Sequence, residues 1–181
     1  MRTLAAAALC AALLAGCGGG SDGGEAVAHV GGEAITQKQL DAVVAHFRNE
    51  FQLEGRSFPP EGTRAFTQAS NQLLGLLVYR TELKQAARKL GVEADPNEIG
   101  KRLAATGAGE QEGTPGGDSF ARDAVEVQIL TEKIYAKVTA GVTRTTRAQT
   151  SQRRNQRMTS FLKRLRNGTE VRYEPGYAPG S

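Results

Sequence analysis

The chain has 181 residues, of which 39% are hydrophobic and 23% are charged, so it is long enough for one domain with a real core and short accessory segments. Its two cysteines, Cys10 and Cys17, both lie at the extreme amino end, which argues against a structural disulfide. The net charge of +4 conceals a dipolar chain, because residues 17–132 hold 17 acidic and 11 basic residues whereas residues 133–169 hold 10 basic residues and no acidic one.

The first 20 residues have the layout of a secretory signal peptide. Arg2 precedes an apolar run, residues 4–14, that is too short to cross a membrane and that leads into the sequence LAGC at residues 14–17. These four residues resemble the lipobox of bacterial lipoproteins, in which the cysteine is lipidated and becomes the first residue of the mature protein. The alternative is an ordinary buried helix that contains a cysteine, but it explains neither the basic start nor the glycines that follow.

The lipobox resemblance implies a signal peptide at residues 1–16, lipidation of Cys17, and a place at the cell membrane, lipid-anchored on its extracytoplasmic face. Residues 17–25 are rich in glycine and predict a flexible tether. Residues 175–181 predict a Pro/Gly tail. We therefore expect the folded domain to occupy residues 26–174.

A hairpin that leads directly into a helix is predicted for residues 27–40. Two short apolar runs flank Gly31-Gly32, which favours a two-residue turn. Thr36 followed by Gln39 is a capping box, in which the two side chains satisfy backbone N–H groups at the start of the helix. A two-stranded ribbon alone is marginal in water, so we expect another element to support it. The best further strand is residues 169–173, and we predict that the two ends of the chain meet.

Five helices are predicted between these strands, from apolar residues at helical spacing and from residues typical of helix ends. They cover about residues 37–54, 61–90, 96–106, 119–140 and 151–167. Residues 107–117 can bury almost nothing and predict a mobile loop, and residues 144–150 are ambiguous. The predicted fold is mainly α: a helical bundle or cradle with a small β element formed by the N-terminal hairpin and the C-terminal strand.

No pattern in the sequence recommends an enzyme. His29 and His46 each stand without a neighbouring cysteine or a cluster of carboxylates, so we interpret each as a structural or surface residue. No Cys/His spacing predicts a metal site, Gly31-Gly32 lacks the rest of a phosphate-binding loop, and no serine stands in a nucleophile elbow. We expect no catalytic residue, no metal and no cofactor.

The basic segment near the carboxyl end predicts a positive surface. Its residues are Arg144, Arg147, Arg153, Arg154, Arg157, Lys163, Arg164 and Arg166. Such a surface could face anionic lipid headgroups, acidic cell-wall polymer or acidic segments of client proteins. The alternative is a solvated helix face whose charges pair with the acidic remainder of the same domain. We do not expect nucleic acid as a partner, because the export signal directs the chain away from it.

The ordered set of elements resembles the amino-terminal chaperone domain of the SurA and PrsA families, which are exported foldases related in fold to the peptide-binding domain of trigger factor. The best-matching segments are VAHVGGEAIT at residues 27–36 and LLVYRTELKQAARKLGV at residues 76–92, and the resemblance covers about residues 26–179. Many members carry a parvulin prolyl-isomerase domain between the last two helices. Residues 140–151 are too short to hold one, so the resemblance implies the chaperone part without the isomerase.

The family resemblance implies ATP-independent binding of unfolded or partly folded exported proteins through a hydrophobic cradle. Candidate cradle residues are Phe51, Phe58, Phe66, Leu74, Val78 and Tyr135. For each of them the alternative is a place in the core. The same fold could instead serve a non-catalytic scaffold or adaptor lipoprotein that docks a dedicated envelope partner, and an active prolyl isomerase is a third reading.

Overall fold

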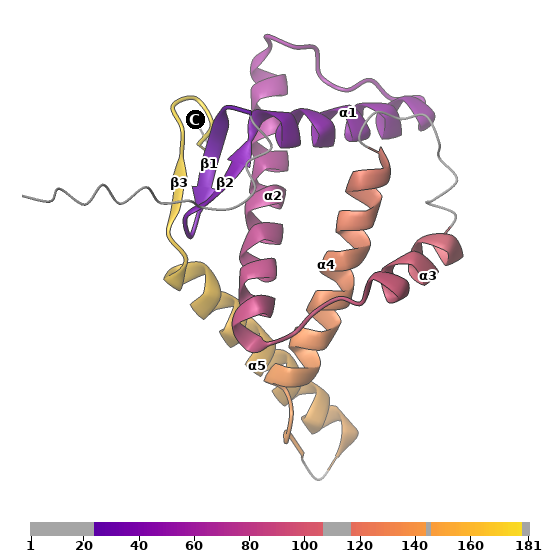
Figure 1. The fold of residues 1–181 in the computed structure, drawn as a ribbon, viewed down its shortest axis with the longest axis vertical. Helices are drawn as coiled ribbons and strands as arrows, with labels where there is room; N and C mark the ends of the chain where they lie inside the picture. The colour runs from indigo at the N-terminus through magenta and orange to yellow at the C-terminus, as the bar shows by residue number, and fades with distance from the viewer. Residues whose placement is uncertain (1–23, 107–116, 144–145, 179–181) are drawn as a thin grey trace, which may run out of the picture.

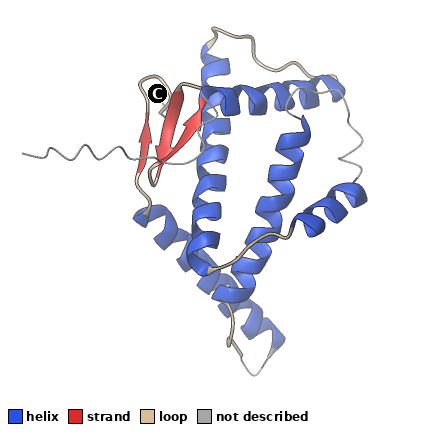
Figure 2. Ribbon diagram, in the orientation of Figure 1, coloured by secondary structure: helices blue, strands red, loops and turns tan. Residues whose placement is uncertain are grey.

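The structure is a computed structural model that describes residues 24–106, 117–143 and 146–178. These residues form three strands and five helices: β1 (Ala26–Val30), β2 (Glu33–Thr36), α1 (Gln37–Leu53), α2 (Arg64–Leu90), α3 (Pro96–Thr106), α4 (Gly117–Val138), α5 (Arg147–Gly168) and β3 (Val171–Tyr173). Helices dominate and the strands form one small sheet (Figure 2), so the predicted mainly α fold with a small β element is confirmed. Most of the predicted loop, residues 107–116, lies outside the described residues.

The three strands form one antiparallel sheet in the order β2-β1-β3. Val30 pairs with Glu33 across the hairpin and with Val171 on its other side. The turn needs its two glycines, because Gly31 and Gly32 have φ values of +54° and +86°, in the left-handed region that other residues rarely adopt. β3 lies beside β1 in Figure 1, and the prediction that the two ends of the chain meet is confirmed.

The hairpin passes into α1 through the predicted capping box. The hydroxyl oxygen of Thr36 accepts a hydrogen bond from the backbone N–H of Gln39 at 3.3 Å, and Oε1 of Gln39 accepts one from the backbone N–H of Thr36 at 2.8 Å. Both bonds satisfy donors that the first helical turn leaves without an intrahelical partner. The direction in which α1 leaves the sheet is therefore fixed locally.

Two other helices begin at threonine caps that the sequence interpretation missed. α2 begins after Thr63 rather than at residue 61, and α5 begins after Thr146 rather than at residue 151. Each hydroxyl accepts a hydrogen bond from a backbone N–H three residues on, at Phe66 (3.1 Å) and Gln149 (3.2 Å). The ambiguous segment before residue 151 therefore contains the cap and first turn of α5.

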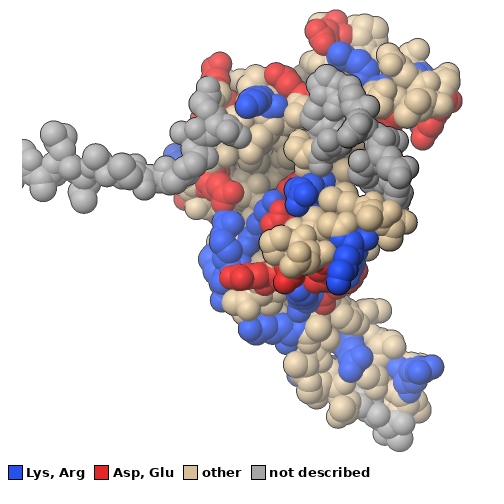
Figure 3. All heavy atoms as spheres, turned by 45° about the vertical axis from the view of Figure 1, so that its right-hand side comes forward, with Lys and Arg blue, Asp and Glu red and all other residues tan. Residues whose placement is uncertain are grey.

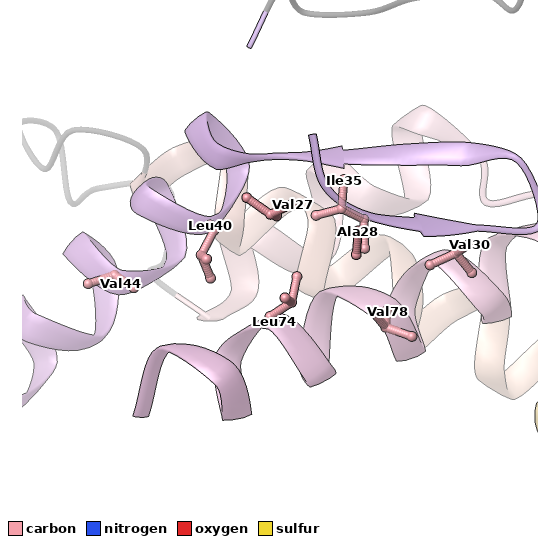
Figure 4. Packing of buried hydrophobic residues seen from close by; sticks show 8 residues of the cluster. All are labelled: Val27, Ala28, Val30, Ile35, Leu40, Val44, Leu74 and Val78. Atoms are coloured by element: carbon pink, nitrogen blue, oxygen red, sulfur yellow. The ribbon is translucent and has the colours of Figure 1, made fainter. Parts of the chain in front are cut away.

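Two clusters of buried apolar side chains lie along α2. The first joins α2 to the sheet and α1 (Figure 4) and consists of Val27, Ala28, Val30, Ile35, Leu40, Val44, Leu74 and Val78. The second joins α2 to α4 and α5 and consists of Leu83, Ala87, Val92, Val127, Leu130, Ile134 and Met158. α2 therefore contributes buried side chains to both clusters and connects them. In Figure 1 the sheet lies on one side of α2 and α4 on the other.

The segment after β3 packs against the domain, so the fold reaches residue 178 and not only the predicted residue 174. Tyr177 contacts the first cluster, and its hydroxyl donates to Oε1 of Gln37 at 2.7 Å. Nδ2 of Asn71 donates to the carbonyl oxygen of Ala178 at 3.1 Å. The ring of Tyr177 and these two hydrogen bonds hold the described part of this Pro- and Gly-rich segment against the domain. Among the helices described, none combines the length and apolar character needed to cross a membrane.

The assignment of Leu74 to the core can be tested by truncation. Leu74→Ala should lower the free energy of unfolding by about 2–5 kcal/mol, because its side chain is 0% exposed and its removal leaves a cavity. Leu53→Ala is the matched control: the same change at a side chain that is 70% exposed should cost less than about 0.5 kcal/mol. Denaturant unfolding of both variants gives the comparison, and equal effects would contradict the assignment.

Candidate functional site

The structure does not bring the six predicted cradle residues into one surface. Leu74 and Val78 are 0% and 6% exposed, so their assignment to an open cradle is corrected: both are core residues beneath the sheet. They belong to the wide apolar stripe on α2. The side chains of that stripe pack in the two clusters and do not form an open binding surface. Tyr135 is half-buried at the second cluster, where its hydroxyl lies 3.3 Å from Oδ1 of Asn155 on α5.

The other three predicted residues come together where α1 ends and α2 begins. The rings of Phe51 and Phe58 have centroids 5.5 Å apart, and those of Phe58 and Phe66 have centroids 6.2 Å apart; both pairs meet edge to face. All three side chains are half-buried. We call them the aromatic patch. Phe58 and Phe66 also pack against the first cluster, which fixes their position. Part of each of the three rings stays exposed to solvent.

Charged side chains occur at and near the aromatic patch. The guanidinium carbon of Arg56 lies 4.2 Å from the ring centroid of Phe51, a cation–π contact, and Arg56 also donates to Glu54 at 2.9 Å. Arg48 donates to Glu61 at 2.7 Å and so ties α1 to the connection that precedes α2. The patch is therefore an apolar surface with a charged border.

A second concave surface, which we call the central pocket, lies between β2, α1, α2 and α4. It has a volume of about 450 Å³, and its apolar lining includes Ile35, Val43, Leu77 and Phe120. Its charged lining includes Lys38, Arg80, Lys84 and Asp123. A pocket of this size with mixed lining could accept a side chain or a short segment.

Three of the charged residues that line the central pocket, together with Glu126, form one ion-pair network. Arg80, only 8% exposed, donates to Asp123 at 2.7 Å, and its guanidinium carbon lies 4.3 Å from the ring centroid of Phe120. Lys84 pairs with Asp123 and also with Glu126 at 2.9 Å. Burial lowers the pKa of Lys84, but its hydrogen bonds to the two carboxylates outweigh burial and leave that pKa above its ordinary value. This network joins α2 to α4, and its two cations and two carboxylates balance one another.

The two histidines have structural surroundings. The ring centroid of His46 lies 4.2 Å from that of Phe120 on α4. Burial lowers the pKa of His46; Glu50 opposes this shift and Arg80 adds to it. His29 is half-buried in β1, with Nε2 3.5 Å from Oε1 of Glu174. In the described parts of the chain, no three His, Cys, Asp or Glu side chains gather as a metal-binding group.

The basic residues of α5 form an exposed surface. Its described members are Arg147, Arg153, Arg154, Arg157, Lys163, Arg164 and Arg166, and all are exposed. None forms an ion pair with a described carboxylate, whereas Arg80, Lys84, Arg88 and Arg102 each do. Arg166 acts on Glu82 only from a distance, lowering a pKa that burial raises more strongly. Arg144 and the predicted lipidation site Cys17 lie outside the described residues.

The charge distribution is visible on the surface. Toward the lower tip of the molecule in Figure 3, blue basic atoms occur without red acidic ones, and in Figure 1 this is the region where α5 begins. The described basic residues of α5 are therefore exposed and available to a partner, and their role as a binding surface stays a prediction. The alternative, that these charges pair with the acidic remainder of the domain, does not describe the contacts seen for the described residues.

The lowered pKa of His46 predicts a pH dependence of stability. The unfolded chain takes up a proton near pH 6.5, the pKa of an unperturbed imidazole, whereas the folded chain resists it until lower pH. The stabilising contribution is thus present above about pH 6.5 and is lost as the pH falls below that value. Between about pH 7.5 and 5.5, the melting temperature of His46→Gln should fall less than that of the wild type. A parallel fall in both would contradict this role, and His29→Gln tests whether the effect is specific to position 46.

The comparisons with known proteins agree with this fold. The chain matches the SurA-like N-terminal domain family over residues 2–137, which include β1 and β2 and reach nearly to the end of α4. Neither the curated proteins nor the solved structures yield a significant match. The matched segment contains the hairpin, the capping box and the whole of α2, which carry the resemblance seen in the sequence. The chain therefore belongs to the SurA-like N-terminal domain family.

Proposed function

We propose that the protein is a membrane-anchored, extracytoplasmic chaperone-like protein that binds unfolded or partly folded exported proteins without ATP. Membership of the SurA-like N-terminal domain family supports binding of peptides or proteins in general. The observation that carries the proposal for this chain is the aromatic patch, where three phenylalanine rings stay half-open to solvent inside a charged border. Leu53, at the same end of α1, is 70% exposed.

The patch supplies a driving force that needs no nucleotide. Burying apolar surface contributes about 25 cal/mol per Å², so a client side chain that covers the open ring edges gains free energy directly. Phe51, Phe58 and Phe66 are already packed against one another, so little side-chain entropy is lost on binding. Arg56 and Glu54 keep the surroundings of the patch hydrated. Transient binding of this kind lowers the concentration of unfolded chains that can aggregate.

The anchor in this proposal is Cys17. The apolar run followed by LAGC supports its lipidation, and the glycine-rich residues that precede β1 would serve as a leash between lipid and domain. Two or more acyl chains give stable attachment, since each buried CH₂ contributes about 0.8 kcal/mol.

We also propose that the domain acts without catalysis. The family match concerns a SurA-like N-terminal domain. The family resemblance implies that many members carry a parvulin domain at the position between α4 and α5, where this chain has only the connection of residues 139–146. Binding and release at the aromatic patch would then be the whole of the activity.

The chaperone proposal is tested by suppression of aggregation at the patch. Phe51→Ser should raise several-fold the dose needed to keep an unrelated unfolded client in solution, because it replaces an apolar ring by a hydroxyl. Phe51→Leu is the matched control and should stay within about twofold of the wild type, since it keeps an apolar side chain. Light scattering during dilution of the client from denaturant gives the dose, and thermal unfolding confirms that both variants fold.

Two outcomes of that experiment would count against the proposal. If Phe51→Ser protects clients as well as the wild type does, the aromatic patch is not the binding surface. If the wild type leaves unrelated clients precipitating at equimolar dose, the protein is better described as an adaptor that docks one dedicated envelope partner.

The anchoring proposal has a separate test. Cys17→Ser removes the sulfur that would carry the lipid, so the variant should move from the membrane fraction to the soluble extracytoplasmic fraction. Cys10→Ser is the control and should fractionate as the wild type does, because residue 10 would be removed with the signal peptide. Membrane association that survives in the Cys17 variant would refute the lipobox assignment.

A further inference from the structure

A groove of about 680 Å³ runs between α5 and the connection that follows α4. Val142 lies on the connection side of the groove, and α5 supplies Arg153, Gln156, Arg157, Ser160 and Arg164. A smaller adjoining hollow of about 350 Å³ shares Arg153 and Gln156 with it and adds Gln149 and Gln152. We call the two together the basic groove. The connection between α4 and α5, which lines the groove, lies near the C-terminal end of α2 (Figure 1), whereas the aromatic patch lies where α2 begins.

The groove-lining side chains occupy one face of a helix that is fixed in position. Arg153, Gln156, Arg157, Ser160 and Arg164 follow one another at intervals that place them on a single stripe. A different stripe of α5 carries Met158, Phe161, Leu162 and Leu165, and these pack on the second cluster. Burial of the apolar stripe therefore sets the orientation of the polar one. Arg157 also donates to the carbonyl oxygen of Ala140 at 3.4 Å, across the groove.

The groove concentrates positive charge that the described residues do not neutralise. It contains three arginines and no acidic residue, and none of these arginines forms an ion pair in the described chain. Arg153 and Arg157 are four residues apart on the helix, where like charges repel. At Arg80 and Lys84, which have the same spacing on α2, the repulsion is offset because both pair with Asp123. An anionic ligand would relieve the repulsion in the groove.

We propose that the basic groove binds an extended, acidic polypeptide segment. From Gln149 to Arg164 the helix rises about 22 Å, which matches six or seven residues of an extended peptide. Arg153 and Arg157 stand about 6 Å apart along the axis, close to the spacing of alternate side chains in an extended chain. Each guanidinium can hold a carboxylate through two parallel hydrogen bonds.

The glutamines favour a peptide over other anions. The carboxamides of Gln149, Gln152 and Gln156 can both donate and accept, and so can pair with the N–H and C=O groups of a peptide backbone. The phosphate groups of a phosphodiester polymer offer only acceptors. A bilayer is disfavoured because the charges line a concave groove and because no large apolar side chain of α5 is exposed for insertion.

The inference goes beyond the proposed function, because the groove lies on different elements from the aromatic patch. Binding of an acidic peptide would stand even if the protein failed to suppress aggregation. Phe51→Ser, which should impair the patch, should leave peptide binding at the groove unchanged. The two proposals can therefore fail separately.

The test uses a fluorescein-labelled peptide of about eight residues with glutamate at alternate positions, and measures its fluorescence anisotropy with the full-length protein. The double variant Arg153→Gln/Arg157→Gln should weaken binding about tenfold or more, because both guanidiniums face the peptide. The double variant Arg154→Gln/Lys163→Gln removes the same charge from α5 outside the groove, and should weaken binding less than about threefold. Thermal unfolding confirms that both variants fold.

Three results would overturn the inference. Equal losses in the two double variants would mean that only the net charge of α5 matters. Equal binding of a peptide with glutamine in place of every glutamate would mean that carboxylates are not recognised. Complete displacement of the peptide by an equal charge concentration of a phosphodiester polymer or of phosphatidylglycerol vesicles would assign the groove to those anions instead.

Discussion

The pairing of β1 with strands from both ends of the described chain is the constraint on which the rest of the structure depends. β1 is central in the sheet, and its residues Val27, Ala28 and Val30 are at most 1% exposed. The ladder to β3 is continued by hydrogen bonds from Gly31 N–H to the carbonyl oxygen of Glu170 and from Glu174 N–H to that of Val27. Because β3 follows α5 directly, this ladder also fixes the C-terminal end of α5. The strand that holds the core together thus helps to position the basic groove.

α2 separates the two proposed sites. The aromatic patch lies at its beginning, and the basic groove lies near its other end, beyond the second cluster. A helix of 27 residues is about 40 Å long, which equals about twelve residues of extended polypeptide. One unfolded client could therefore reach both sites with apolar and acidic segments a dozen residues apart. Two weak contacts joined in this way bind far better than either alone.

The sequence predicted those features that local chemistry decides. Gly31-Gly32, the capping box and the terminal strand each follow from a few neighbouring residues, and the sheet followed from them because a lone hairpin needs support. The burial of Leu74 and Val78 beneath the sheet could not be predicted. Helical periodicity shows that both side chains lie on an apolar face, but it does not show which element packs against that face. The packing of Tyr177 could not be predicted either, because its hydrogen-bond partner Gln37 lies 140 residues away in the chain. The cap at Thr63 was missed because Phe66, three positions on, is not the Glu or Gln of a capping box. The cap at Thr146 was missed because the segment after Gln149 is polar and shows no apolar periodicity until Met158.

The contrast between paired and unpaired charges explains why the two sites should respond differently to salt. At the α2–α4 interface Arg80 is nearly buried, and a buried charge without a partner would be costly, so Asp123 and its neighbours neutralise it. On α5 the cations are exposed, where the absence of a partner costs little and leaves their field open to solvent. Screening over about 8–10 Å at physiological ionic strength weakens such a field, whereas burial at the aromatic patch does not depend on it. If a client occupies both proposed sites, rising salt should therefore loosen its acidic segment first, while its apolar segment stays attached.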